Sequence, residues 1–126
     1  MPLTNVGCND IAAAVVGASF TPYNNANAYL GVGDSTTPFV ATQTDLQASS
    51  NKLRKPMDPT YPNVSGASCV FEATFNSGDA NFTWNEWGVF NAASGGNMLS
   101  RKVETLGTKT NTQVWVLTVT DAFSTP

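Results

Sequence analysis

Residues 67–92 read ASCVFEATFNSGDANFTWNEWGVFNA, and this stretch decides the fold class. The first part, residues 67–75, alternates strictly between two sets of side chains. One side carries Cys69, Phe71, Ala73 and Phe75, and the other carries Ser68, Val70, Glu72 and Thr74. A period of two is typical of a β-strand with one buried face. The turn-forming residues NSGDAN (76–81) then predict a hairpin-type connection to the next strand.

The strand predicted over residues 81–92 has a broken period. Its large apolar side chains fall on opposite faces, with Phe82 and Trp84 against Trp87 and Val89. A one-residue bulge near residues 85–86 would bring all four to the same side, because a bulge shifts the alternation. We therefore expect this strand to be bulged and to lie in the centre of a sheet.

Four further strands are expected outward from this stretch, at residues 28–35, 52–58, 98–104 and 112–123. Pro56 has no N–H to donate to a neighbouring strand, so the strand at 52–58 should lie at a sheet edge. Residues rich in Asn, Pro and Gly between the strands predict exposed loops at 21–27 and 58–66.

A short helix is expected before the first strand. Residues 11–16 are apolar and include three alanines, Asn9 or Asp10 is placed to cap the first turn, and Gly17 is placed to end the helix. About six strands and one helix predict a single all-β domain over residues 1–126. The expected architecture is an antiparallel β-sandwich, jelly-roll-like, with one short N-terminal helix. The ends, 1–8 and 121–126, lack a core pattern and are expected to be flexible.

The composition excludes several classes of function. Of 126 residues, only 12% are charged, against about a quarter in typical proteins. The net charge of −3 disfavours a nucleic-acid partner, because phosphate binding needs an excess of cations. No apolar run approaches the ~20 residues of a membrane span, and no secretory signal is evident. No membrane partner is expected, and the chain should start in the cytoplasm where it is made.

Catalytic chemistry is also poorly represented. The chain contains no histidine, which removes the commonest general base and metal ligand. GVGDS (31–35) lacks the third glycine and the lysine of a phosphate-binding loop, and the nine carboxylates are scattered. We therefore expect no catalytic residue, no metal site and no cofactor. Cys8 and Cys69 lack metal-ligand or redox spacing; free thiols are the first interpretation, and a disulfide between them stays open.

Glu86 stands out because it lies between Trp84 and Trp87. A carboxylate that bulky aromatic rings desolvate needs a partner, and a guanidinium suits it best, so the candidates are Arg54 and Arg101. The alternative is a Glu86 side chain that points to solvent beside the bulge.

The aromatic residues divide into two groups by position. Trp84, Trp87 and Trp115 lie on predicted strands and are assigned structural roles, whereas Tyr23, Phe39 and Tyr61 lie in predicted loops. Apolar rings in loops often anchor a partner, so these three are the candidate partner-binding residues. Packing of the loops themselves is the alternative.

Three segments also resemble a known group of proteins. NAYLGVGDSTTPFVATQTDLQ (27–47), NKLRKPMD (51–58) and NFTWNEWGVFNAASGGNMLSRKVETLGTKTNTQVWVLTVT (81–120) are similar to small virion proteins of tailed bacteriophages. The most specific part is WNEWGVFNAASGG (84–96). The resemblance covers most of the chain and carries no catalytic residue with it.

The resemblance implies a structural protein of the virion, made in the bacterial host. The leading hypothesis is a capsid decoration or cement protein that binds the major capsid protein through loops 21–27, 34–47 and 58–65. The alternative is a tail-fibre or baseplate protein, and a more distant one is a carbohydrate-binding β-sandwich. A domain this small has little surface with which to grip a shell, so self-association is expected. A trimer is implied by the threefold positions of icosahedral shells.

Overall fold

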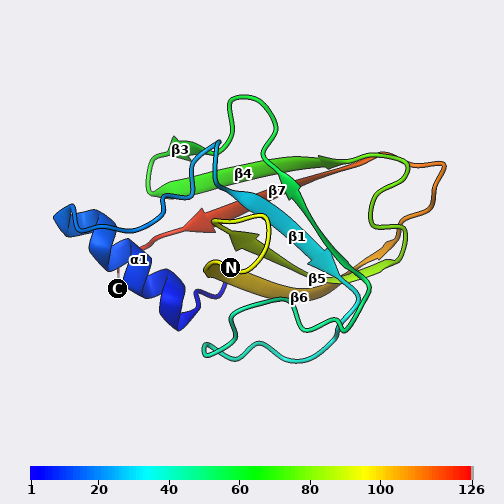
Figure 1. Cartoon of the computed structure of the whole chain (residues 1–126), viewed down its shortest axis with the longest axis horizontal. Helices are drawn as coiled ribbons and strands as arrows, with labels where there is room; N and C mark the ends of the chain where they lie inside the picture. Colours follow the sequence, from blue (N-terminus) through cyan, green and yellow to red (C-terminus); the bar gives the residue numbers. More distant parts are fainter. Residues whose placement is uncertain (126) are drawn as a thin grey trace.

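Two antiparallel sheets pack face to face in the computed structural model, which describes residues 1–125 (Figure 1). The elements in chain order are α1 (Asn5–Val16), β1 (Tyr29–Gly33), β2 (Lys52–Pro56), β3 (Asn63–Ser65), β4 (Ser68–Phe75), β5 (Thr83–Phe90), β6 (Met98–Thr108) and β7 (Trp115–Ala122). One sheet has the order β2-β1-β5-β6 and the other has β3-β4-β7. The predicted β-sandwich with one N-terminal helix is confirmed.

The core lies between the two sheets and follows the predicted alternation. In β4 the side chains of Phe71, Ala73 and Phe75 are buried, and in β7 the buried side chains are every second residue from Leu117 onward. Aromatic rings fill the centre: the Trp84 ring lies edge-on to Phe75 and to Trp115, with centroid distances of 4.8 and 4.9 Å. Trp87 is also buried in this cluster.

The predicted irregularity in β5 is present, although its form differs. The register between β5 and β6 shifts between Trp84 and Glu86, and the extra residues lie on β6, where 104–106 stand opposite Asn85. The Thr105 hydroxyl donates to Asn85 Oδ1 across this gap (2.8 Å). Phe82, Trp84, Trp87 and Val89 all join the same core cluster. β5 is interior to its sheet, between β1 and β6, as expected.

The connection at residues 76–81 is not a hairpin, which corrects the prediction. It crosses from β4 in one sheet to β5 in the other, and no hydrogen-bonded pairing joins these two strands. The buried Lys109 ammonium holds the crossing, since it donates to Asn76 O (2.7 Å) and Asn81 Oδ1 (2.8 Å). Turn-forming residues reverse the chain but do not specify which strands pair.

A second correction concerns residues 58–66, which were expected to form only a loop. Part of this stretch is β3, which pairs with β4 through the tight turn at Gly66 (φ 59°). β3 is three exposed residues long, too short for a period to be visible in the sequence.

The helix starts earlier than expected. Thr4, and not Asn9 or Asp10, caps it: the Thr4 hydroxyl accepts from Gly7 N (2.9 Å) and donates to the Met98 carbonyl. Gly17 ends the helix in the left-handed conformation (φ 72°), as predicted.

The first residues also differ from the expected flexible segment over 1–8. Arg101 N donates to Pro2 O (3.2 Å), and Thr4 N donates to Leu99 O (3.0 Å), so the chain extends the edge of β6 before α1 begins. At the other end, β7 continues to Ala122, within the predicted flexible segment 121–126. Pro126 lies outside the described residues.

Candidate functional site

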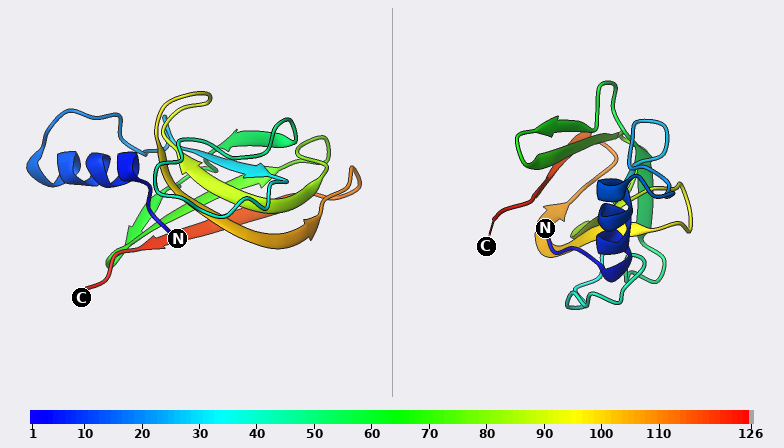
Figure 2. Two further views of the ribbon diagram at one scale, coloured as in Figure 1. Left: turned by 90° about the horizontal axis from the view of Figure 1, so that it is seen from below. Right: turned by 90° about the vertical axis from the view of Figure 1, so that its left-hand side faces the viewer.

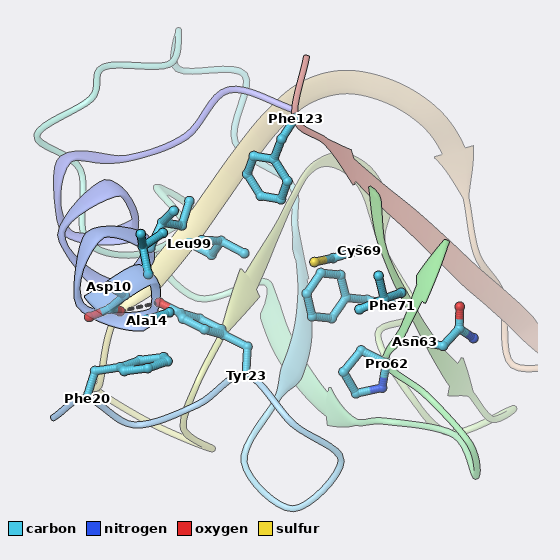
Figure 3. A pocket seen from close by; sticks show the side chains of 13 residues that line it. Asp10, Ala14, Phe20, Tyr23, Pro62, Asn63, Cys69, Phe71, Leu99 and Phe123 are labelled. Atoms are coloured by element: carbon cyan, nitrogen blue, oxygen red, sulfur yellow. Dashed lines mark hydrogen bonds between the residues drawn. The ribbon is translucent and has the colours of Figure 1, made fainter. Parts of the chain in front are cut away.

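An open apolar groove lies at the end of the sandwich, beneath α1 (Figure 3). Its volume is about 430 Å³. Ile11 and Val15 contribute from α1, Tyr23 comes from the loop that follows, and Phe71 and Leu99 close the floor from β4 and β6. A concave, mainly apolar site of this size is the usual form of a binding site for an apolar ligand or side chain.

The way α1 is attached creates the groove. The backbone of α1 rests on β6 at Gly7, where any side chain would collide with the Leu99 backbone. The helix then projects away from the sandwich toward its C-terminal end, as seen in Figure 2. Its last turn is left uncovered, with Val15 80% and Val16 77% exposed. A gap therefore remains between the helix and the sheets.

Tyr23 and Asp10, two polar residues of the groove, are paired with each other. The Tyr23 hydroxyl donates to Asp10 Oδ2 (2.7 Å), and Asn97 Nδ2 donates to both oxygens of the same carboxylate (3.0 and 3.2 Å). Burial, together with the Asp10 carboxylate, raises the pKa of Tyr23 well above its ordinary value of 10, so the hydroxyl stays protonated. This arrangement fixes the loop to the helix.

The cysteine in the groove is not activated. Burial, and secondarily the Asp121 carboxylate, raises the pKa of the Cys69 thiol, which disfavours the nucleophilic thiolate. Cys69 is half-buried, Cys8 is exposed, and both are free thiols. The groove is thus lined mainly by apolar groups.

The second notable site is the buried ion pair of Glu86 and Arg101. Arg101 Nε donates to Glu86 Oε1 at 2.9 Å, and neither side chain has any exposed surface. Glu86 also accepts backbone hydrogen bonds from Gln47 (2.8 Å), Ala48 (2.9 Å) and Ser35 (3.3 Å). A carboxylate with this many donors is fully satisfied inside the protein.

The guanidinium of Arg101 completes the attachment of the same loop. Its remaining nitrogens donate to the Gln43 side chain (3.1 Å) and to Thr37 O (2.9 Å). The ion pair therefore ties the loop between β1 and β2, residues 34–51, to the face of the first sheet. Its role is to give a long connection one conformation.

Arg54, the other candidate partner of Glu86, lies elsewhere. Its guanidinium stacks on the Phe90 ring, 3.5 Å from the centroid, and pairs with Asp45 at 3.2 Å. It also donates to Ala92 O (2.8 Å) and Gly95 O (3.0 Å), and so fixes the turn before β6.

The three predicted partner-binding aromatics are not brought together. Tyr23 and Tyr61 are half-buried and pack against the main core, while Phe39 is half-buried within the loop held by Arg101. Only Tyr23 lines the groove. Sequence reasoning missed Val15, Val64 and Phe123, which also line it. The adjacent valines before Gly17 were the available signal, because neighbouring apolar side chains at a helix end are candidates for contact with another surface.

Comparisons with known proteins add no identity: no protein-family model and no curated protein matches the chain. Within residues 1–125, no cluster of three or more His, Cys, Asp or Glu side chains is placed to hold a metal ion. The described part of the chain also has no helix with the length and apolar character needed to cross a membrane.

Proposed function

We propose that this protein is a non-enzymatic structural component of a bacteriophage particle, a decoration protein that binds the outside of the capsid and reinforces contacts between capsid subunits. The observation that carries the proposal is the apolar groove with its exposed rim. The resemblance of residues 84–96 to small virion proteins supports the class.

The rim of the groove has the character of a protein-binding surface. Val15 on α1 is 80% exposed and Val64 on β3 is 77% exposed, so two separate elements present uncovered valines at the same opening. Exposed apolar side chains around a groove are typical of protein interaction sites. A capsid subunit would fill the groove with an apolar side chain and cover both valines.

Two of the three predicted contact loops border this groove. Loop 21–27 supplies Tyr23, and loop 58–65 supplies Pro62 and Val64. The third, 34–47, is fixed by Arg101. A pre-formed surface loses little entropy on binding, which favours tight attachment by a small domain.

The test is rebinding to particles from which this protein has been removed. The variants Val15→Ser and Val64→Ser should each weaken rebinding several-fold while leaving the melting temperature unchanged, because both side chains are exposed. Leu106→Ser is the matched control: this side chain is 44% exposed on β6 but lies seven residues beyond Leu99, away from the groove.

Two outcomes would overturn the proposal. Normal rebinding by both valine variants would remove the groove as the contact surface. Co-purification of the protein with detached tails and not with heads would replace decoration by the tail-fibre or baseplate alternative.

A further inference from the structure

Strand β7 forms an open edge of the second sheet (Figure 1). It pairs along its whole length with β4, from Trp115 opposite Phe75 to Ala122 opposite Ser68. Among the described residues, no strand pairs with its other side. Such an edge presents a row of backbone N–H and C=O groups that can pair with another strand.

The register tells which residues carry these free groups. Phe123 N donates to Ala67 O (2.9 Å), so the odd-numbered residues of β7 direct their backbone groups toward β4. In an antiparallel ladder the direction alternates, and the even-numbered residues point outward. Val116, Thr118, Thr120 and Ala122 therefore offer unpaired donors and acceptors, and their side chains are exposed.

The other three edges carry features that block strand pairing. β2 contains Lys52, Arg54, Lys55 and Pro56, β3 is only three residues long, and β6 is covered by residues 2–4 at one end and carries Lys102 and Glu104. Charges, proline and short length are the usual means by which proteins protect edges. β7 has no proline and no basic residue, and its one charge, Asp121, is buried. The edge of β7 therefore lacks the features that block pairing with another strand.

We propose that two copies of this chain pair through β7, antiparallel about a twofold axis near Val119. Three strands from each copy would then form one continuous sheet in the order β3-β4-β7-β7-β4-β3. All four outward-facing residues would be paired, with Val116 opposite Ala122 and Thr118 opposite Thr120 of the second copy.

A second copy is the occupant because the edge is complementary to itself. Even residues face even residues in this register, so each outward donor meets an outward acceptor. Threonine pairs and valine–alanine pairs pack well across antiparallel strands, and no charge is opposed by a like charge on the outer face. A twofold interface of this kind closes on itself and exposes no further edge. A trimer assembled by strand pairing would need β7 to pair with one of the protected edges.

The first test is sedimentation of the full chain with two variants. Thr118→Pro removes an outward N–H and no bond to β4, and an edge strand tolerates proline there. Thr120→Lys places like charges on both sides of the axis. Each should raise the dimer dissociation constant about tenfold or more, since two or more hydrogen bonds are weakened per dimer. Thr105→Lys, an exposed threonine on β6, should leave the dimer intact.

The second test is amide hydrogen exchange by NMR. In the dimer, the amides of Val116, Thr118 and Thr120 should be protected, and dilution should release them while Leu117 and Val119 stay protected by β4. A chain that is monomeric at millimolar concentration, or a dimer in which the even-numbered amides exchange freely, would overturn the proposal. Protection that appears only on addition of a different protein would equally overturn it.

Discussion

Glu86 and Arg101 form an ion pair, 2.9 Å between Oε1 and Nε, in which both side chains are completely buried. They lie on neighbouring strands β5 and β6, next to the register shift, and together hold the backbone of residues 35, 37, 47 and 48. The stability of the loop between β1 and β2 should therefore depend on this pair more than on any single contact at its surface.

The first prediction concerns the loss of this carboxylate. Glu86→Gln should lower the free energy of unfolding by about 3–5 kcal/mol, because it leaves the Arg101 cation buried without a counter-charge. Urea denaturation measures this. Asp45→Asn is the control: Asp45 pairs with Arg54 and Lys52 but is partly exposed, at 44%, so its loss should cost about 0–1 kcal/mol. Equal costs for the two variants would show that burial of the Glu86 pair contributes nothing.

The second prediction concerns the contact between α1 and β6 at Gly7. Gly7→Ala should destabilise the protein by about 1–3 kcal/mol, because the new methyl group would collide with the Leu99 carbonyl oxygen and lie 2.9 Å from the carbonyl carbon. Helix propensity alone would predict the opposite sign, since alanine is favoured in a helix. Gly78→Ala is the control: its Cβ would meet nothing within 4 Å, and a compatible site should gain about 0.4–1 kcal/mol. Thermal unfolding of both variants decides between packing and propensity.

The third prediction is a pH dependence caused by Asp121. Burial raises the pKa of this carboxyl, and the opposing bond from Ser100 Oγ (2.8 Å) and the nearby N-terminus do not cancel the effect. Above about pH 4, where an unfolded aspartate has ionised, the folded protein binds more protons than the unfolded chain. The stability that the protonated Asp121 carboxyl contributes is therefore lost as pH rises, until the carboxyl of the folded protein has also ionised.

Asp121→Asn cannot titrate and should lack this dependence. The unfolding free energy of the wild type relative to this variant should fall as pH rises from about 4, measured by urea denaturation across pH. Asp79→Asn should show a pH dependence of the opposite sign, because a hydrogen bond from Lys55 lowers the pKa of Asp79. Its contribution is lost as pH falls below about 4. An unfolding free energy of the wild type, relative to Asp121→Asn, that rises with pH would contradict the prediction.

The fourth prediction is a difference between the two thiols. Cys8 is exposed and should react first with a thiol reagent at pH 8, while Cys69 should react more slowly, because burial raises its pKa and restricts access. Mass spectrometry of the native protein after brief alkylation separates them. Val64 on β3 lies directly opposite Cys69 on β4. Val64→Ser should therefore accelerate the alkylation of Cys69 and leave that of Cys8 unchanged. Equal rates in the native protein would refute the assignment.

Much of the fold was predictable because it rests on local patterns. The alternation in residues 67–75 identified a strand with one buried face, and Pro56 identified an edge. The pairing of strands was less accessible. The connection 76–81 has every feature of a hairpin, yet the strands it joins lie in different sheets, because both present apolar faces to the same core.

The candidate site was less predictable than the fold. Tyr23 was selected as a loop aromatic, but its hydrogen bond to Asp10 and its place in the groove depend on where α1 rests. Val15 and Val64 are 49 residues apart in the numbering and meet at the groove only because α1 and β3 lie at the same end of the sandwich.

The sequence by itself determined the β-sandwich class and singled out Glu86, with Arg54 and Arg101 as candidate partners and exposure to solvent as the alternative. Only the tertiary structure decided that this partner is Arg101 and not Arg54, that residues 1–4 join β6, and that β7 is left as the unprotected edge. The physical reason is range. Alternation and turn formation are set by neighbouring residues, whereas ion pairs, grooves and sheet edges depend on contacts between segments far apart in the chain.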